Sequence, residues 1–147
     1  MTTMDAWNTA AWNDYNLTLI DDLRAHNGTA TEGRFAGREL LLLVTTGAKS
    51  GQPRTAPLAF TRDGERYVVI ASKGASPTNP DWYHNLVNNP NATVEVGGES
   101  FAARATIAEG EERRRLYDNQ ARLLPAFAEY ERKTTRQIPV VVLERID

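Results

Sequence analysis

The sequence predicts an α+β fold, a six-stranded antiparallel β-barrel with an N-terminal helix and two inserted helices. Two observations support this prediction: the turn signals Asp63-Gly64 and Gly97-Gly98 separate short hydrophobic segments, and residues 100–107 alternate in polarity. Both are typical of antiparallel strands joined by hairpins. The chain of 147 residues fits one domain, residues 1–147, and closing six short strands into a barrel removes exposed sheet edges.

A helix is expected first, over residues 5–26, because apolar or aromatic side chains recur there every four positions. Asn27 and Gly28 would end this helix, since both residues tolerate a left-handed backbone. Hydrophobic and β-branched segments then predict six strands, over residues 39–45, 56–61, 67–71, 93–96, 100–107 and 138–143. The last of these is continuously apolar and is therefore expected to lie inside the sheet.

The two inserted helices have different signals. Pro80 suits the start of a short helix, with Asn79 as its N-cap and Asp81 in the favourable first turn. A charged helix is expected to begin near Glu109, and Pro125 should kink or divide it because proline cannot donate a helical hydrogen bond.

Composition excludes several classes of protein. The chain has no cysteine, and His26 and His84 lack metal-binding spacing, so no metal site is expected. A formal charge of −2 argues against nucleic acid as a partner. No apolar run of about 18 residues and no secretory leader is visible, so a cytoplasmic protein without a transmembrane segment is expected. Peripheral membrane contact, and a monomeric or homodimeric state, stay open.

The segment TTGAKSGQPR, residues 45–54, combines glycines, hydroxyls and positive charge directly after a hydrophobic strand. Such a loop predicts a site for an anionic small molecule, because backbone amides and cations together bind phosphate or carboxylate groups. Ala48 before Lys49 departs from the nucleotide P-loop pattern, so that motif is excluded. The alternative is a polar hairpin turn that binds nothing.

A second loop repeats this composition with Ser72, Lys73 and Gly74. If the strands 56–61 and 67–71 pair through Asp63-Gly64, then Lys73 lies near Arg54 and the two loops form one cationic pocket. The sequence presents no Ser–His–acid order and no paired carboxylates. A chain with an anion pocket but no reactive groups of its own is expected to take its chemistry from a cofactor.

These segments, together with ASKGASPTNPDWYHNLVNNP and the late IPVVVLERI, resemble the deazaflavin-dependent nitroreductase family. The resemblance implies a split β-barrel, an FMN-binding-like fold, and the deazaflavin coenzyme F-420 (F420) as cofactor. It assigns the phosphate and polyglutamate tail to Lys49, Ser50, Gln52 and Arg54, the adjoining wall to Pro57, Leu58 and Ala59, and the ring to Ser72, Lys73, Gly74, Asp81, Trp82 and Tyr83. Trp82 and Tyr83 have a structural alternative, as plugs of the core.

The expected function is that of an oxidoreductase, which transfers a hydride from reduced F420 to an electrophilic small molecule. An activated alkene (as in an ene-reductase), a quinone or a nitroaromatic would accept the hydride. Tyr130 is the candidate catalytic residue, because its hydroxyl can protonate the reduced product; water as the proton source, or Tyr130 as a packing residue, are the alternatives. An FMN-dependent split-barrel reductase and a non-catalytic deazaflavin-binding protein are the competing functions.

Overall fold

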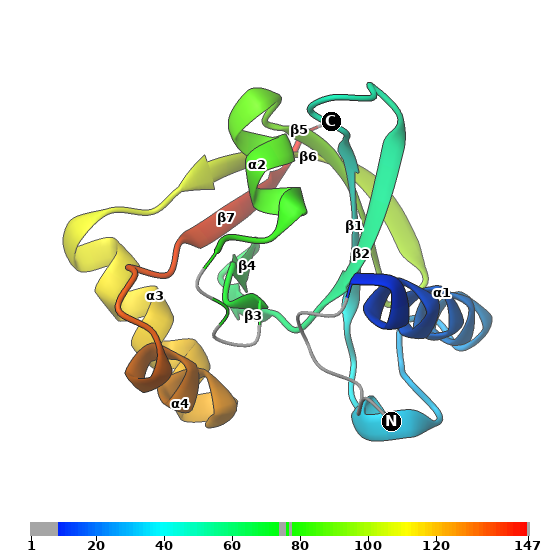
Figure 1. Ribbon diagram of the computed structural model, residues 1–147, viewed down its shortest axis with the longest axis horizontal. Coiled ribbons are helices and arrows are strands. Elements are labelled where there is room, and N and C mark those ends of the chain that lie inside the picture. The colour runs from blue at the N-terminus through cyan, green and yellow to red at the C-terminus, as the bar shows by residue number, and fades with distance from the viewer. Residues whose placement is uncertain (1–8, 74–75, 77, 147) are drawn as a thin grey trace.

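The computed structural model describes residues 9–73, 76 and 78–146, without the side chains of residues 9–15 and 34 (Figure 1). Within these residues the helices are α1 (Thr9–Ala25), α2 (Asp81–Asn88), α3 (Gly110–Leu123) and α4 (Ala126–Lys133), with a short 3₁₀ helix η1 (Gly33–Phe35). The strands are β1 (Leu41–Thr46), β2 (Pro53–Leu58), β3 (Thr61–Asp63), β4 (Arg66–Ile70), β5 (Asn91–Val96), β6 (Glu99–Ile107) and β7 (Val140–Arg145).

All seven strands form one antiparallel sheet in the order β2-β1-β5-β6-β7-β4-β3. The two edge strands, β2 and β3, are neighbours in the chain and are separated only by Ala59 and Phe60. Because so short a connection joins opposite edges, the sheet must curl until those edges approach each other. The result is a half-barrel that wraps around α2 (Figure 1).

The expected closed barrel of six strands is therefore wrong in two respects. The segment 56–61 divides at Ala59-Phe60 into parts of β2 and β3, of which the first pairs with β1 and the second with β4. The sheet also stays open, since β2 and β3 do not pair with each other. Pro53 and Pro57 give β2 the character of an edge strand, because proline lacks the N–H that a further neighbour would need.

The continuous hydrophobic run at β1 follows from burial on both faces of the sheet. Leu41 and Leu43 face the inside of the half-barrel, where they join a core that includes Trp82 and Leu86 of α2. The alternate residues Leu40 and Leu42 pack instead in a second cluster, with Leu19, Ile20 and Leu23 of α1. Two-sided burial explains why this strand lacks the polar alternation of a half-exposed one.

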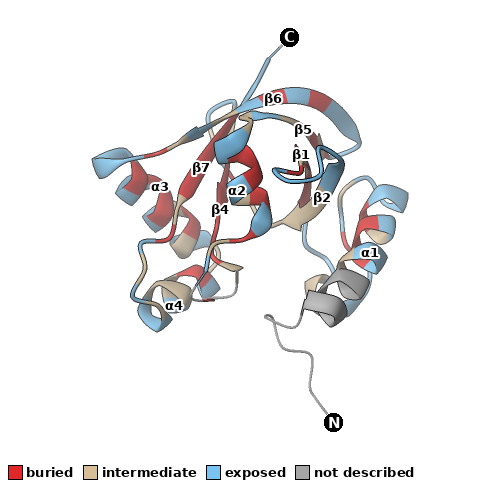
Figure 2. Cartoon of the chain, turned by 45° about the horizontal axis from the view of Figure 1, so that its top comes forward, coloured by how far each residue is buried: buried red, intermediate tan, exposed pale blue. Residues whose placement is uncertain are grey.

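The strands β4 and β7 are buried in the same two-sided way. Val69 and Val141 point into the half-barrel, while Val68 and Val142 join an outer cluster. α3 and α4 cover that outer face with Leu116, Tyr117 and Phe127 (Figure 2). The prediction that the segment at residues 138–143 lies inside the sheet is confirmed, because β7 has β6 and β4 as neighbours.

The charged helix expected from Glu109 is two helices, α3 and α4, so four helices replace the three that the sequence predicts. They separate at Leu124 and Pro125, as proline requires. The first predicted helix corresponds to α1, and its expected residues 5–8, Trp7 among them, lie outside the described part of the chain. No helix in the described ranges is long and apolar enough to cross a membrane.

Asp63 at the β3–β4 turn makes the stability of the fold depend on pH. Hydrogen bonds from Arg115, at 3.0 Å, and from Arg66 lower the pKa of this carboxyl from 3.8 to about 2. Because the folded pKa lies below the ordinary value, the charged carboxylate stabilises the fold above pH 4, and this stabilisation is lost as the pH falls toward 2.

We therefore expect Asp63→Asn to lower the free energy of unfolding at pH 7 by about 1 kcal/mol, a small value because solvent screens the pair. Urea unfolding of wild type and variant at pH 7 and at pH 2 measures this difference. It should shrink at the lower pH. A difference that is the same at both pH values would show that the ion pairs do not stabilise the fold.

Candidate functional site

The turn between β1 and β2, residues 47–52, owes its shape to two glycines. Gly47 N–H donates to Gln52 O at 2.8 Å, and Gly51 N–H donates to Gly47 O at 2.9 Å. A Cβ on Gly47 would lie 2.6 Å from Ser50 Oγ, and Gly51 has a φ of +71°. A side chain at the first position would force the Ser50 side chain to move and would crowd Gln52 O, 3.2 Å away, and a side chain at the second position would be strained. Glycine at both positions thus favours the shape of this turn, whatever it binds.

The turn exposes its positive charge. Lys49, Ser50, Gln52 and Arg54 are all exposed, and Ser50 Oγ accepts hydrogen bonds of 3.1 Å from Gln52 N–H and Arg54 Nη2. Within the described residues, the backbone N–H groups of Lys49 and Ser50 have no acceptor. Two consecutive amides beside two cations can accept a phosphate or carboxylate. The residues present therefore fit the anionic part of a coenzyme.

Asn85 of α2 ties this turn to the helix inside the half-barrel. Its Oδ1 accepts a 2.9 Å hydrogen bond from Ala48 N–H, and its Nδ2 donates to Thr45 Oγ1 at 3.0 Å. Asn85 and Thr45 are both buried, so the bond between them is shielded from water, while the bond from the exposed Ala48 is part-buried. The two segments that the sequence singles out, 45–54 and 71–86, are thus brought together by one side chain.

From the sequence, Asn85 is expected at most to cap the helix or bond backbone, and its position on the helix carries a stronger signal. Trp82, Asn85 and Leu86 share the buried face of α2, at the spacing i, i+3 and i+4. A polar residue on the apolar stripe of a helix requires a buried partner. Its partners lie 37 and 40 positions away in the chain, so they cannot be deduced from local patterns.

Replacing Asn85 by leucine should lower the free energy of unfolding by about 1–3 kcal/mol, because it leaves the Ala48 N–H and the Thr45 hydroxyl without their partner. Denaturant unfolding measures the effect. Asn88→Leu is the matched control, since Asn88 is exposed on the same helix. Equal losses of stability in the two variants would contradict the bridging role of Asn85.

The second loop connects β4 to α2 and carries Ser72, which is buried, and Lys73, which is half-buried. Lys73 has a φ of +48°, an uncommon conformation for a residue with a side chain. Its Nζ is 3.5 Å from Thr78 Oγ1. Gly74, which the sequence also assigns to the site, lies outside the described residues.

Arg136, in the segment between α4 and β7, contacts this loop through its guanidinium group. It donates to the carbonyl oxygens of Ala71, Ser72 and Ser76 and to Asn79 Oδ1, over distances of 2.6–3.1 Å. Asn79 is therefore not the N-cap of α2; Pro80 occupies that position, and no side chain caps the helix. No local sequence pattern marks Arg136 as a contact of this loop, since its partners lie 57–65 positions away.

The predicted juxtaposition of Arg54 and Lys73 does not follow from strand register. β3 pairs with β4 only over Thr61–Asp63. The preceding strand, β2, pairs with β1 instead, so that Arg54 is opposite Thr45. The connection between the two loops runs instead through α2 and Asn85. Pro57, Leu58 and Ala59 are half-buried, and Leu58 packs against the core inside the half-barrel.

The helix residues of the predicted ring site differ in exposure. Trp82 is 8% exposed and belongs to the inner core, which supports its role as a plug of the half-barrel. Tyr83 is half-buried beside that core, and Asp81 is exposed in the first turn. Of the three, Asp81 and Tyr83 retain surface that a ligand could contact.

Tyr130 lies on α4, far from the β1–β2 turn in Figure 1. Its ring meets Phe127 edge to face, with 5.3 Å between centroids, and the residue is half-buried. Its hydroxyl has no hydrogen-bond partner among the described residues. Tyr117 differs: its hydroxyl donates to Phe127 O at 2.7 Å, and burial raises its pKa to about 12.

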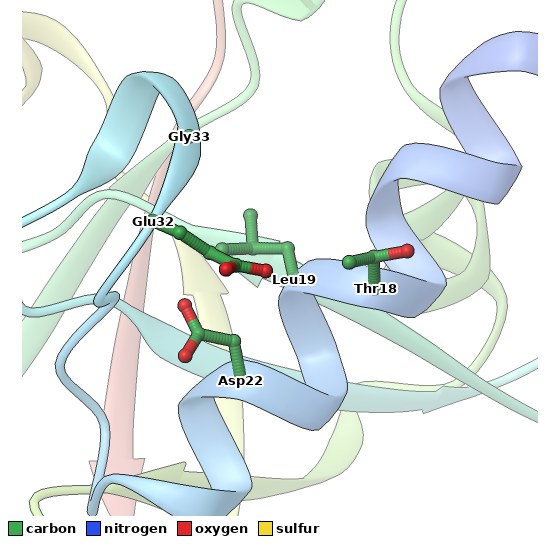
Figure 3. Close-up of a pocket in the computed structure, with 5 residues that line it drawn as sticks. All are labelled: Thr18, Leu19, Asp22, Glu32 and Gly33. Atoms are coloured by element: carbon green, nitrogen blue, oxygen red, sulfur yellow. The ribbon is translucent and has the colours of Figure 1, made fainter.

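Two cavities lie away from these residues. One, of about 300 Å³, is bordered by Thr18, Leu19, Asp22, Glu32 and Gly33, and Figure 3 shows the Asp22 and Glu32 carboxylates on facing sides of it. The other, of about 170 Å³, lies between the end of α1 and the β5–β6 turn. The acidic lining of the larger cavity disfavours an anionic coenzyme. The candidate site is thus the open surface at the cationic turn.

The chain belongs to the F420H2-dependent quinone reductase family, whose family model matches residues 18–145. A relative from Mycobacterium tuberculosis, an F420H2-dependent quinone reductase, is 40% identical over 136 residues, which cover 84% of this chain and 89% of the relative. The expected coenzyme, F420, is the one on which the family depends, and this prediction is confirmed. The narrower label of a nitroreductase stays a prediction.

Two solved structures resemble this chain in sequence and in fold. An F420-H2 dependent reductase (FDR-A) is 40% identical with a TM-score of 0.67, and the match covers 71% of this chain and 93% of that one. A structure described as a domain-swapped dimer is 34% identical with a TM-score of 0.69, and the match covers 93% of this chain and all of that one. Both likenesses support the half-barrel as the fold of this chain.

Proposed function

We propose that this protein transfers a hydride from reduced F420 to a quinone. The observation that supports this most is the cationic β1–β2 turn, which Asn85 attaches to the helix inside the half-barrel. A turn with exposed Lys49 and Arg54 suits a coenzyme with a long anionic tail, and the family match supplies the identity of that coenzyme. When bound, reduced F420 supplies a hydride, two electrons with one proton, to the acceptor.

In this proposal the turn fixes one end of the coenzyme, and the second loop and α2 fix the other. Lys49 and Arg54 bind tail carboxylates or phosphate, with Ser50 and Gln52 beside them. Pro57, Leu58 and Ala59 form the adjoining wall, while Ser72, Lys73, Gly74, Asp81 and Tyr83 flank the ring, and Trp82 packs behind them in the inner core. Since positioning alone lowers a bimolecular barrier by several kcal/mol, the chain needs no nucleophile of its own.

We propose Tyr130 as the donor of the proton that the reduced acceptor requires. Hydride addition to a quinone gives a hydroquinone anion, and addition to an activated alkene gives an enolate; one proton completes either product. α4 ends at Lys133, three residues before Arg136, which contacts the second loop. Tyr130 thus lies on the helix that leads into a segment attached to the proposed ring site. Tyr117 is unsuited to this role because its hydroxyl is already bonded and buried.

A comparison of acceptors tests the proposed substrate class. With saturating reduced F420, we expect kcat/KM to be highest for a simple quinone, lower for a cyclohexenone-type alkene and lower again for a nitroaromatic compound. The reason is that a quinone yields the most stable anion after hydride addition, so its barrier is lowest. Rates measured anaerobically by the return of deazaflavin fluorescence give the order. A preference for the nitroaromatic compound would replace quinones as the proposed substrate.

Other properties stay proposals. FMN as the cofactor is the competing chemistry, although a single phosphate needs fewer cations than this turn offers. A non-catalytic deazaflavin-binding protein would bind F420 without turnover.

The similarity to a domain-swapped dimer favours a dimeric state for this chain, and a cytoplasmic location stays a prediction.

A further inference from the structure

The loop from β4 to α2 has little support from its own backbone. Its described residues form the hydrogen bonds Ser72 N–H to Ile70 O and Ser76 N–H to Lys73 O, and Lys73 adopts a left-handed conformation. A left-handed residue with a side chain persists where its surroundings enforce it. Here Arg136 contributes to those surroundings, because it donates a hydrogen bond to Ser72 O, next to Lys73.

Arg136 joins the two ends of this loop. Its Nη2 donates to Ala71 O at 3.1 Å and to Ser72 O at 2.8 Å, where the loop leaves β4. Its Nε and Nη1 donate to Ser76 O at 2.9 Å and to Asn79 Oδ1 at 2.6 Å, where the loop approaches α2. One planar group thus sets the distance between the start and the end of the loop.

The charge of Arg136 has no counter-ion among the described residues, because each of its four acceptors is a neutral oxygen. The guanidinium group is partly buried, and desolvation lowers its pKa. Arginine nevertheless stays protonated in proteins. Neutral oxygens satisfy its N–H groups without cancelling its charge, so a positive potential remains beside Ser72 and Lys73.

We propose that Arg136 is a positioning residue for coenzyme binding, which fixes the Ser72–Lys73 part of the loop in the conformation that receives F420. This inference rests on the proposed function. Arg136 acts through the loop backbone and supplies positive potential, while direct contact with the coenzyme falls to the loop.

Arg113 offers a matched control. It is a buried arginine that donates two hydrogen bonds to a carbonyl, Ile138 O at 3.1 and 2.7 Å, but it makes none to the loop. Both variants, Arg136→Gln and Arg113→Gln, lose an arginine that donates hydrogen bonds to backbone carbonyl oxygens. Only the first also frees the loop, so a general loss of stability would affect the two variants alike.

Two measurements separate the variants. Fluorescence titration should show that Arg136→Gln raises the Kd for F420 about tenfold, because a displaced loop loses contact with the anionic coenzyme worth about one hydrogen bond to a charged group. Arg113→Gln should bind as wild type. Hydrogen exchange should show faster exchange of the amides of Ser72 and Ser76 in Arg136→Gln alone. An unchanged Kd, or equal changes in both variants, would overturn the proposal.

Asn79→Ala provides a second, milder variant that applies if Arg136→Gln does not fold. It removes one of the four acceptors and should raise the Kd for F420 two- to fivefold, by the same reasoning at smaller scale. An unchanged Kd in Asn79→Ala together with unchanged exchange at Ser76 would overturn the proposal. Wild-type protein that fails to bind F420 would contradict the proposed function instead, while the exchange experiment still decides whether Arg136 fixes the loop.

Discussion

Tyr130→Phe is expected to lower kcat for a cyclohexenone-type acceptor by about 10²–10⁴-fold, the usual contribution of a positioned general acid. The affinity for F420 should be almost unchanged, because Tyr130 lies on α4 and is remote from the cationic turn (Figure 1). Steady-state kinetics at saturating reduced coenzyme measures the effect. The loss should be smaller with a quinone, since a hydroquinone anion is less basic than an enolate and depends less on a donor.

Tyr117→Phe is the matched control for this experiment. It removes the hydrogen bond to Phe127 O from a fully buried residue, so it should lower stability and leave the turnover of folded enzyme intact. Undiminished turnover in Tyr130→Phe would assign Tyr130 to packing against Phe127 and leave water as the proton source.

Arg54→Ala is expected to weaken F420 binding by about 1.5–3 kcal/mol, the range for hydrogen bonds to charged groups. That corresponds to an increase in Kd of about 10- to 150-fold. Arg54 is exposed and bonded to Ser50 Oγ, so its removal takes one of the two cations from the turn without opening the core. Fluorescence titration at two salt concentrations measures the loss, and the affinity of wild type should fall more with salt than that of the variant.

Arg38→Ala serves as the control for total charge, because Arg38 is exposed and precedes β1, at the opposite end of that strand from the turn. It should leave both the Kd and its salt dependence close to those of wild type. Equal losses for Arg54→Ala and Arg38→Ala would indicate that overall charge, and not the turn, determines affinity.

Local patterns predicted most of the elements but not the division of one predicted strand into the two edge strands of the sheet. The hydrophobic runs at β1, β4 and β7 and the hairpin at Gly97-Gly98 lie where the sequence places them. The division between β2 and β3 could not be seen, because Ala59 and Phe60 carry no turn signal and the bend depends on pairing with β1 and β4. An open half-barrel in place of a closed barrel follows from that division.

The candidate site was predictable in its charged groups and not in its supports. Lys49, Arg54 and Lys73 stand out because glycine-rich cationic loops have a known chemistry. Asn85 and Arg136 act through hydrogen bonds to segments at least 37 positions away, and no local pattern encodes such partners. The predicted pairing of residues 56–61 with residues 67–71 connected the two loops wrongly, because β2 does not pair with β4 and α2 connects the loops instead.

The most direct measurement of the central claim is anaerobic reduction of a quinone by the purified protein, with equal concentrations of reduced F420 or reduced FMN as the donor. We predict enzyme-dependent formation of hydroquinone with reduced F420, one equivalent for each equivalent of coenzyme oxidised, and a much smaller enzyme-dependent rate with reduced FMN. The absence of enzyme-dependent oxidation of reduced F420, or an equal enzyme-dependent rate with reduced FMN, would contradict the proposed function.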